Sequence, residues 1–333
     1  MYSPSVVAGE LVFVGSCSGK FLALDRRSGR VEWEYDIHAD GEQTSFHGAP
    51  LTSDDLVLTA TDNGFRRSGI GHVYAFEQTT GRLRWKHVCE TGIPSDVVPV
   101  GVGVCVVTMD LALICLDRAT GELRWRFATD GERPDVRDTQ SLAVLDGCVF
   151  FAGRDETLYA LDGRNGEVCW MTPLAAQPTC APVVLHRSVY VGTAWPCMHR
   201  LDPGTGCVQT TLPLASVPCR VPVCTGSSLL VFLGDSTLAA LDPGLTRVLW
   251  SRAASAKWNQ SRALLVGDRV LVGDAAGQLL ALALADGSVS SQQTFAQADI
   301  RSLAKWQDTL YVGTLRGTLY ACQLDHWPAG EVR

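Results

Sequence analysis

One spacing pattern repeats along the chain and constrains its fold more than any other feature: an acidic residue, a glycine four positions later, and a tryptophan four positions after that. The complete copies are Asp25/Gly29/Trp33, Glu77/Gly81/Trp85, Asp117/Gly121/Trp125 and Asp162/Gly166/Trp170. Later copies are eroded, with Thr210 in the tryptophan position, Thr246 in the glycine position, and little more than Gly287 in the seventh. With the apolar run 310–324, one module of about forty residues is written about eight times.

The pattern has a physical reason in a tight turn between two strands. An aspartate at the end of a strand can accept hydrogen bonds from backbone NH groups in the turn that follows. The glycine can take the positive φ that closes this turn. The tryptophan then lies on the next strand, where its large apolar ring can fill the gap between neighbouring sheets. We therefore interpret these residues as residues that stabilise the fold, and we infer no function from them.

The composition favours an all-β fold. Hydrophobic residues make up 46% of the chain, and the 32 glycines suit many half-buried strands joined by tight turns. No long window shows helical periodicity. A period of about forty residues is enough for four short strands, so the repeat predicts one ring-shaped domain rather than several ordinary ones.

The repeat resembles a known family in the segments LVFVGSCSGKFLALDRRSGRVEW at 11–33 and LALICLDRATGELRW at 111–125. These are similar to the quinoprotein-type (PQQ-like) β-propeller repeat of bacterial proteins, a family that includes the outer-membrane assembly lipoprotein scaffold. The resemblance implies a single all-β domain over 1–333, an eight-bladed β-propeller of four-stranded antiparallel blades. We place the blades at 3–36, 46–88, 96–128, 138–172, 178–213, 220–252, 259–295 and 299–333. Gly330–Arg333 can supply the outer strand of the last blade. Otherwise this blade keeps an open strand edge, which favours association with other chains.

The charge and the cysteines limit the partners and the compartment. A net charge of −7 spread along the chain argues against a nucleic-acid partner. No apolar stretch is long enough for a membrane span. We expect the protein to be a monomer.

The twelve cysteines show neither zinc spacing nor a compact disulfide framework. So many thiols favour a cytoplasmic location. The alternative is the periplasm, with a signal peptide already removed.

In a propeller, the residues at the start of each blade converge on the central channel, and counting back from the second strand of each blade identifies them. This predicts a polar ring formed by His47, Asp96, Asp138, Gln140, Arg220, Asn259, Gln260, Arg262 and Arg301. Arginines come from blades six to eight, and carboxylates come from blades three and four. Trp258, next to this ring, is the tryptophan that we expect to stack on a ligand.

Two interpretations of this ring stay open. In the first, the arginines clamp a small anionic or zwitterionic ligand in a funnel. In the second, the charges pair with one another across the channel and hold the blades in register. A shift of one residue in any strand would turn its side chain from the channel into the blade.

A quinone-dependent dehydrogenase, the best-known activity of the family, is disfavoured by the residues. Those enzymes carry adjacent cysteines over the cofactor and a calcium site of Glu, Asn and Asp. This chain has no Cys-Cys pair, and its channel offers no suitable glutamate. We therefore expect neither pyrroloquinoline quinone nor calcium, and no other cofactor or metal.

Two functions of different classes remain. The first is a non-catalytic propeller that serves as a protein-interaction scaffold or as a sensor of a small ligand. The second is a cofactor-independent cytosolic enzyme with its active site in the funnel. That enzyme would use His47 with Asp96 or Asp138 as acid and base, and the arginines as anion clamps. We favour the first.

Overall fold

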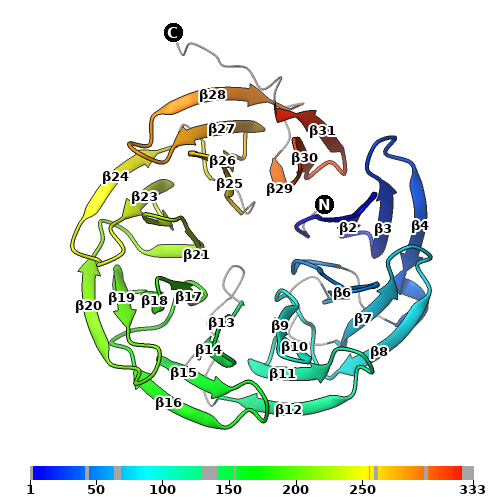
Figure 1. Ribbon diagram of the computed structural model, residues 1–333, viewed down its shortest axis with the longest axis horizontal. Helices are drawn as coiled ribbons and strands as arrows, with labels where there is room; N and C mark the ends of the chain where they lie inside the picture. Colours follow the sequence, from blue (N-terminus) through cyan, green and yellow to red (C-terminus); the bar gives the residue numbers. More distant parts are fainter. Residues whose placement is uncertain are drawn as a thin grey trace.

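Antiparallel β-sheets follow one another around a ring in the computed structural model, which describes residues 3–41, 45–63, 69–129, 141–153, 155–254, 256–258, 262–295 and 299–324 (Figure 1). There are eight sheets, and each contains strands that are consecutive in the sequence. The predicted eight-bladed β-propeller is therefore confirmed.

The first four blades are built as follows. Blade one contains β1 (Val6–Ala8), β2 (Leu11–Gly15), β3 (Lys20–Asp25) and β4 (Val31–Asp36), followed by the short 3-10 helix η1 (Ile37–Asp40). Blade two contains β5 (Leu51–Ser53), β6 (Leu56–Ala60), β7 (Gly71–Glu77) and β8 (Leu83–Cys89). Blade three contains β9 (Val98–Val100), β10 (Gly103–Val107), β11 (Ala112–Asp117) and β12 (Leu123–Ala128). Blade four contains β13 (Ala143–Leu145), β14 (Cys148–Ala152), β15 (Thr157–Asp162) and β16 (Val168–Pro173).

The second half repeats this plan. Blade five contains β17 (Val183–Leu185), β18 (Ser188–Thr193), β19 (Cys197–Leu201) and β20 (Val208–Pro213). Blade six contains β21 (Pro218–Cys224), β22 (Leu229–Leu233), β23 (Thr237–Leu241) and β24 (Val248–Ala253). Blade seven contains β25 (Leu264–Val266), β26 (Arg269–Gly273), β27 (Gln278–Ala283) and β28 (Val289–Thr294). Within the described residues, blade eight contains β29 (Ile300–Trp306), β30 (Thr309–Thr314) and β31 (Leu319–Gln323). Its expected outer strand, Gly330–Arg333, lies outside the described residues.

The repeated turn forms as the sequence predicts. In blade one, Asp25 Oδ1 accepts hydrogen bonds from the backbone NH of Ser28 at 2.7 Å and of Arg27 at 3.2 Å. The NH of Gly29 donates to the Asp25 carbonyl at 2.9 Å, and Gly29 has a φ of +70°. Because L-residues rarely adopt this φ, glycine is the favoured residue at the position.

The tryptophans act as plates between neighbouring blades. Trp125, on the outer strand of blade three, lies over Gly166 in blade four, where an added Cβ would come within 2.7 Å of the indole. The indole NH of Trp125 also donates to the Gly163 carbonyl at 3.1 Å. Trp33, Trp85, Trp170 and Trp250 make the same kind of contact and the same kind of hydrogen bond with the following blade. The glycine is thus required twice, once by its φ and once by the ring above it.

The contact between blades five and six replaces this plate with a leucine. Blade five carries Thr210 where other blades have tryptophan, and the positive φ in the next turn falls on Leu245 (φ +54°) instead of Thr246, the position expected from the repeat. The loop has the same length as in the other blades, but its hydrogen bond closes one residue earlier, from the NH of Leu245 to the Asp242 carbonyl at 2.8 Å. The Leu245 side chain is 1% exposed and fills the space. Tyr190 Oη, from β18, donates to the Pro243 carbonyl at 2.6 Å, which is the position that an indole NH uses elsewhere.

The ring closes between blade one and blade eight. The NH of Ser5 donates to Ser302 Oγ at 2.7 Å, and their hydroxyl groups lie 2.8 Å apart. Val12 and Val14 pack against Tyr311 in a buried cluster. Inner strands from the two ends of the chain therefore join the ring at this seam (Figure 1).

Candidate functional site

The predicted channel residues that the structure describes lie at the starts of the innermost strands. His47 precedes β5, Asp96 precedes β9, and Arg262 precedes β25, while Arg220 and Arg301 lie within β21 and β29. These strands surround the centre of the ring (Figure 1). Asp138, Gln140, Asn259 and Gln260 lie outside the described residues.

Asp96 and Arg262 form an ion pair between opposite sides of the ring. They belong to blades three and seven, which are four blades apart in a ring of eight. Asp96 is 8% exposed, and its Oδ1 accepts the backbone NH of Ala49 at 2.7 Å. Its Oδ2 also accepts the Ser141 hydroxyl at 2.9 Å. One carboxylate thus connects blades two, three, four and seven, which fits the interpretation that channel charges hold the blades in register.

The other two arginines are also bonded to the protein. Arg220 has a φ of +65° at an irregularity in β21, and its Nη2 donates to the Trp258 carbonyl at 2.9 Å. Its guanidinium carbon lies 5.9 Å from the centre of the Phe232 ring, in cation–π geometry. Arg301 Nη2 donates to Asp299 Oδ2 at 2.6 Å. The anion clamp expected from three converging arginines is therefore engaged with internal partners.

Trp258 is a packing residue. Its side chain is 2% exposed and meets the Phe232 ring edge-on, with ring centres 6.4 Å apart. It belongs to the apolar core shared by blades six and seven. This corrects the expectation that Trp258 stacks on a channel ligand, because burial leaves neither face of its ring open.

His47 pairs with Asp62 and not with Asp96. Its Nδ1 lies 2.5 Å from Asp62 Oδ2, and the Asp62 side chain is fully buried. Burial by itself would lower the pKa of His47, but the hydrogen bond and charge of Asp62, with a contribution from Cys17, outweigh burial and raise this pKa to about 9. His47 is therefore protonated at neutral pH and is unsuited to act as a general base. The sequence signal for Asp62, a polar residue two positions after the apolar strand 56–60, was too weak to identify it as the partner.

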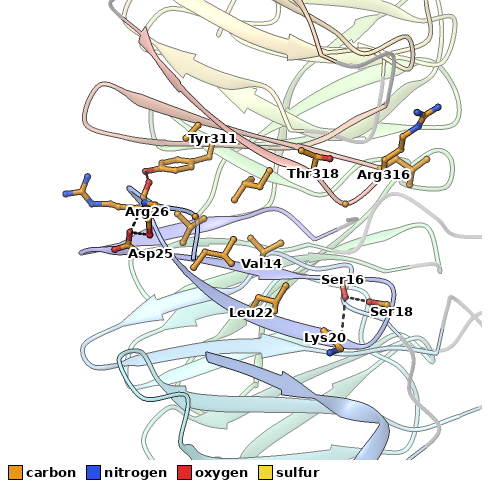
Figure 2. Close-up of a pocket in the computed structure, with 18 of the residues that line it drawn as sticks. Val14, Ser16, Ser18, Lys20, Leu22, Asp25, Arg26, Tyr311, Arg316 and Thr318 are labelled. Carbon is orange, nitrogen blue, oxygen red and sulfur yellow. Dashed lines mark hydrogen bonds between the residues drawn. The ribbon is translucent and has the colours of Figure 1, made fainter. Parts of the chain in front are cut away.

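A groove between blades eight and one is a feature that sequence reasoning missed. We call it the seam groove and define its walls as Val14, Leu22 and Leu24 of blade one and Tyr311, Leu319 and Ala321 of blade eight. Its volume is about 980 Å³. Figure 2 shows it running between the two blades, with Asp25 and Arg26 toward one end and Ser16, Ser18 and Arg316 toward the other. It exists only when the ring is closed.

Within the described part of the chain, no three His, Cys, Asp or Glu side chains are grouped so that they could hold a metal ion. None of the helical segments described there is long and apolar enough to span a membrane. All twelve cysteines are free thiols.

The chain is similar to proteins of one family along most of its length. The family model described as outer membrane protein assembly factor BamB matches residues 2–206 and 174–325. The BamB protein of Moranella endobia is 21% identical over 59% of this chain and 50% of its own length. The serine/threonine-protein kinase AfsK of Streptomyces griseus is 31% identical over 55% of this chain and 22% of its own.

The chain spans about half the length or less of these curated relatives. Among solved structures, BamB from Moraxella catarrhalis superimposes with a TM-score of 0.79, 20% identity and 96% coverage of both chains. At this identity the likeness shows the fold alone. The name of the BamB relatives refers to the outer membrane.

Proposed function

We propose that this chain, which belongs to the PQQ-like β-propeller family described as outer membrane protein assembly factor BamB, is a non-catalytic scaffold that binds a protein partner. The observation that carries the proposal is the Asp96–Arg262 ion pair across the ring. A channel whose charges bond to one another has little charge left for a small ligand. A rigid ring with its polar centre occupied in this way presents its outer surfaces and its seam to other molecules.

The enzyme alternative lacks a general base at His47. The buried Asp62 keeps His47 protonated, so His47 could serve only as the acid of the pair. Asp96, the expected base that the structure describes, is ion-paired with Arg262. The described arginines expected to clamp an anion also have internal partners. We include no quinone and no calcium in the proposal, because the sequence lacks the adjacent cysteines that the resemblance would require.

The partner should be recovered equally well by channel variants. We expect Arg220→Ala and Arg301→Ala to capture the same protein as wild type, in amounts within about twofold, because residues away from an interface contribute little to binding. The measurement is affinity capture from the source cells with quantitative mass spectrometry. Wild type and both variants are compared after their circular dichroism spectra have been matched.

Loss of the partner in both folded channel variants would contradict the scaffold proposal and favour a channel site. If cytosolic and envelope fractions are prepared separately, the same experiment also shows in which compartment the chain and its partner are found. Twelve free thiols favour the cytosolic fraction, and the name of the BamB relatives favours the envelope.

A further inference from the structure

An exposed cysteine, an imidazole and a buried carboxylate lie in a row where blades one and two meet. Cys17 is in the turn between β2 and β3 and is exposed. Its side chain is hydrogen-bonded to His47, which precedes β5. His47 Nδ1 in turn lies 2.5 Å from Asp62 Oδ2. Because Asp62 occupies Nδ1, Nε2 is the ring nitrogen left for the thiol. A nucleophile, an imidazole and an orienting carboxylate in this order are the arrangement that activates a cysteine.

The turn that carries Cys17 is held in one conformation by its own hydrogen bonds. The NH of Ser16 donates to the Lys20 carbonyl at 2.9 Å, and the NH of Gly19 donates to the Ser16 carbonyl at 3.3 Å. The hydroxyl groups of Ser16 and Ser18 lie 2.8 Å apart, and the NH of Lys20 donates to Ser16 Oγ at 3.1 Å (Figure 2). The thiol is therefore presented from a closed turn.

The segment that carries His47 is packed against this turn. Phe46, directly before His47, is fully buried. Gly15, two residues before Cys17, lies so close to it that an added Cβ would come within 2.5 Å of Phe46 Cβ. On the other side of the imidazole, the Asp62 side chain is fully buried. The imidazole is thus held between the turn and a buried carboxylate.

The imidazole in this row is a cation at neutral pH. Burial lowers the pKa of His47, but Asp62 and Cys17 outweigh burial and raise this pKa to about 9. A cation next to a cysteine favours the thiolate, which is the nucleophilic form of the side chain. Protonation makes His47 unsuited to be a general base, but it is what the partner of a thiolate needs.

Cys17 differs in this respect from the other cysteines. Cys169 and Cys207 are the other two exposed cysteines. Cys169 is hydrogen-bonded to a second thiol, and the Cys207 thiol has no hydrogen-bond partner among the described residues. Burial raises the pKa of the thiols of Cys89 and Cys180 to about 12, and buried thiols of this kind are inert. Exposure and a hydrogen bond to an imidazolium are thus combined at Cys17.

We propose that Cys17 is a thiolate nucleophile that forms a reversible mixed disulfide with a small-molecule disulfide, R–S–S–R. The thiolate attacks one sulfur of the reagent, so that a bond from Cys17 Sγ to this sulfur forms while the S–S bond of the reagent breaks. The leaving RS⁻ takes the proton of His47. In sum, Cys17–S⁻, His47–H⁺ and RSSR give Cys17–S–S–R, neutral His47 and RSH, with the small disulfide as the oxidant. Excess RSH reverses the reaction. This inference goes beyond the proposed scaffold function and does not depend on it.

The probe for this site is bis(2-hydroxyethyl) disulfide, which is uncharged and is not steered by the charges of the protein. The full chain is reacted with it, and mass spectrometry follows the mixed disulfide at each cysteine over time. A free cysteine with a pKa of about 8.5 is only about 1% ionised at pH 6.5. At that pH we expect Cys17 to react about tenfold faster than Cys207, or more. The ratio of the two rates should fall severalfold at pH 8.5, where an ordinary thiol is about half ionised.

Two variants test the role of His47. His47→Gln replaces the imidazolium by a neutral amide and should slow the reaction of Cys17 at pH 6.5 by about tenfold, while the rate at Cys207 stays unchanged. His38→Gln is the matched control. The His38 ring lies against Gly19 of the same turn, but its Nδ1 is 2.7 Å from Asp36 Oδ1. We expect this variant to leave both rates unchanged. Circular dichroism checks the folding of each variant.

Equal rates for Cys17 and Cys207 in the wild-type chain at pH 6.5 would overturn the proposal, and this comparison needs no variant. An unchanged Cys17 rate in folded His47→Gln would also overturn it. The same holds if His38→Gln slows Cys17 as much as His47→Gln does, because the effect would then come from a disturbed turn. A fast Cys17 that is slowed by His47→Gln alone supports the proposal.

Discussion

Replacing Trp125 by alanine is expected to lower the free energy of unfolding by about 3–5 kcal/mol, the cost of removing a large buried aromatic side chain. The indole is 7% exposed, lies over Gly166 and donates to the Gly163 carbonyl. Its loss would leave a cavity between blades three and four and an unpaired buried carbonyl. Urea unfolding followed by fluorescence and circular dichroism measures the change.

Leu123→Ala is the matched control for the tryptophan plate. Leu123 lies two residues earlier on the same strand, β12, and is 53% exposed. We expect its replacement to cost less than about 0.5 kcal/mol, as for an ordinary surface position. A Trp125→Ala variant as stable as Leu123→Ala would show that the plates do not hold the blades together.

Raising the pH from 6.5 to 8.5 is expected to remove about 2–3 kcal/mol of stability through His47. Its pKa is raised to about 9 in the folded protein by Asp62, against 6.5 in the unfolded chain. A raised folded pKa means that the stabilisation is fully present below pH 6.5 and is lost as the pH rises through about 9. Urea unfolding at a series of pH values measures this slope.

His47→Gln should flatten the slope, because the neutral amide does not titrate. His186→Asn, at an exposed turn position with positive φ, is the control that should keep it. Burial raises the pKa of the thiols of Cys89 and Cys180 to about 12, so ionisation of these thiols in the unfolded chain adds a slope of its own from about pH 8 upward. Wild type and His47→Gln share these thiols, so the difference between their slopes isolates His47. Equal slopes in wild type and His47→Gln would contradict the buried His47–Asp62 pair.

The fold could be predicted from the sequence because the residues of each repeat interact over short distances along the chain. The aspartate, glycine and tryptophan of each copy act within one turn and on the next blade, so eight copies at a regular spacing determine a ring. The exception at Leu245 is also local, since a hydrogen bond that closes the turn one residue earlier moves the positive φ by one position. Such features depend on spacing along the chain, which a single sequence displays.

The channel could be predicted only in outline, because its partners are far apart in sequence. Counting back from each second strand brought Asp96 and Arg262 to the right end of their strands, but nothing in the sequence pairs two residues 166 positions apart. Trp258 was misassigned because a tryptophan outside the repeat carries no local sign of burial. The seam groove depends on the first and last blades meeting, and no pattern within either blade reveals it.

The most direct test of the central claim, that the channel is internally bonded and the protein is a scaffold, is a thermal-shift screen of the purified chain. The panel contains small carboxylates, amino acids and phosphates, with pyrroloquinoline quinone plus calcium. A ligand at a hundred times its dissociation constant stabilises a protein by about 2.7 kcal/mol, which for a chain of this size raises the melting temperature by roughly 2–4 °C. We predict no shift with any compound of the panel. A reproducible rise that disappears in Arg220→Ala and Arg301→Ala would contradict the account and place a small-molecule site in the channel.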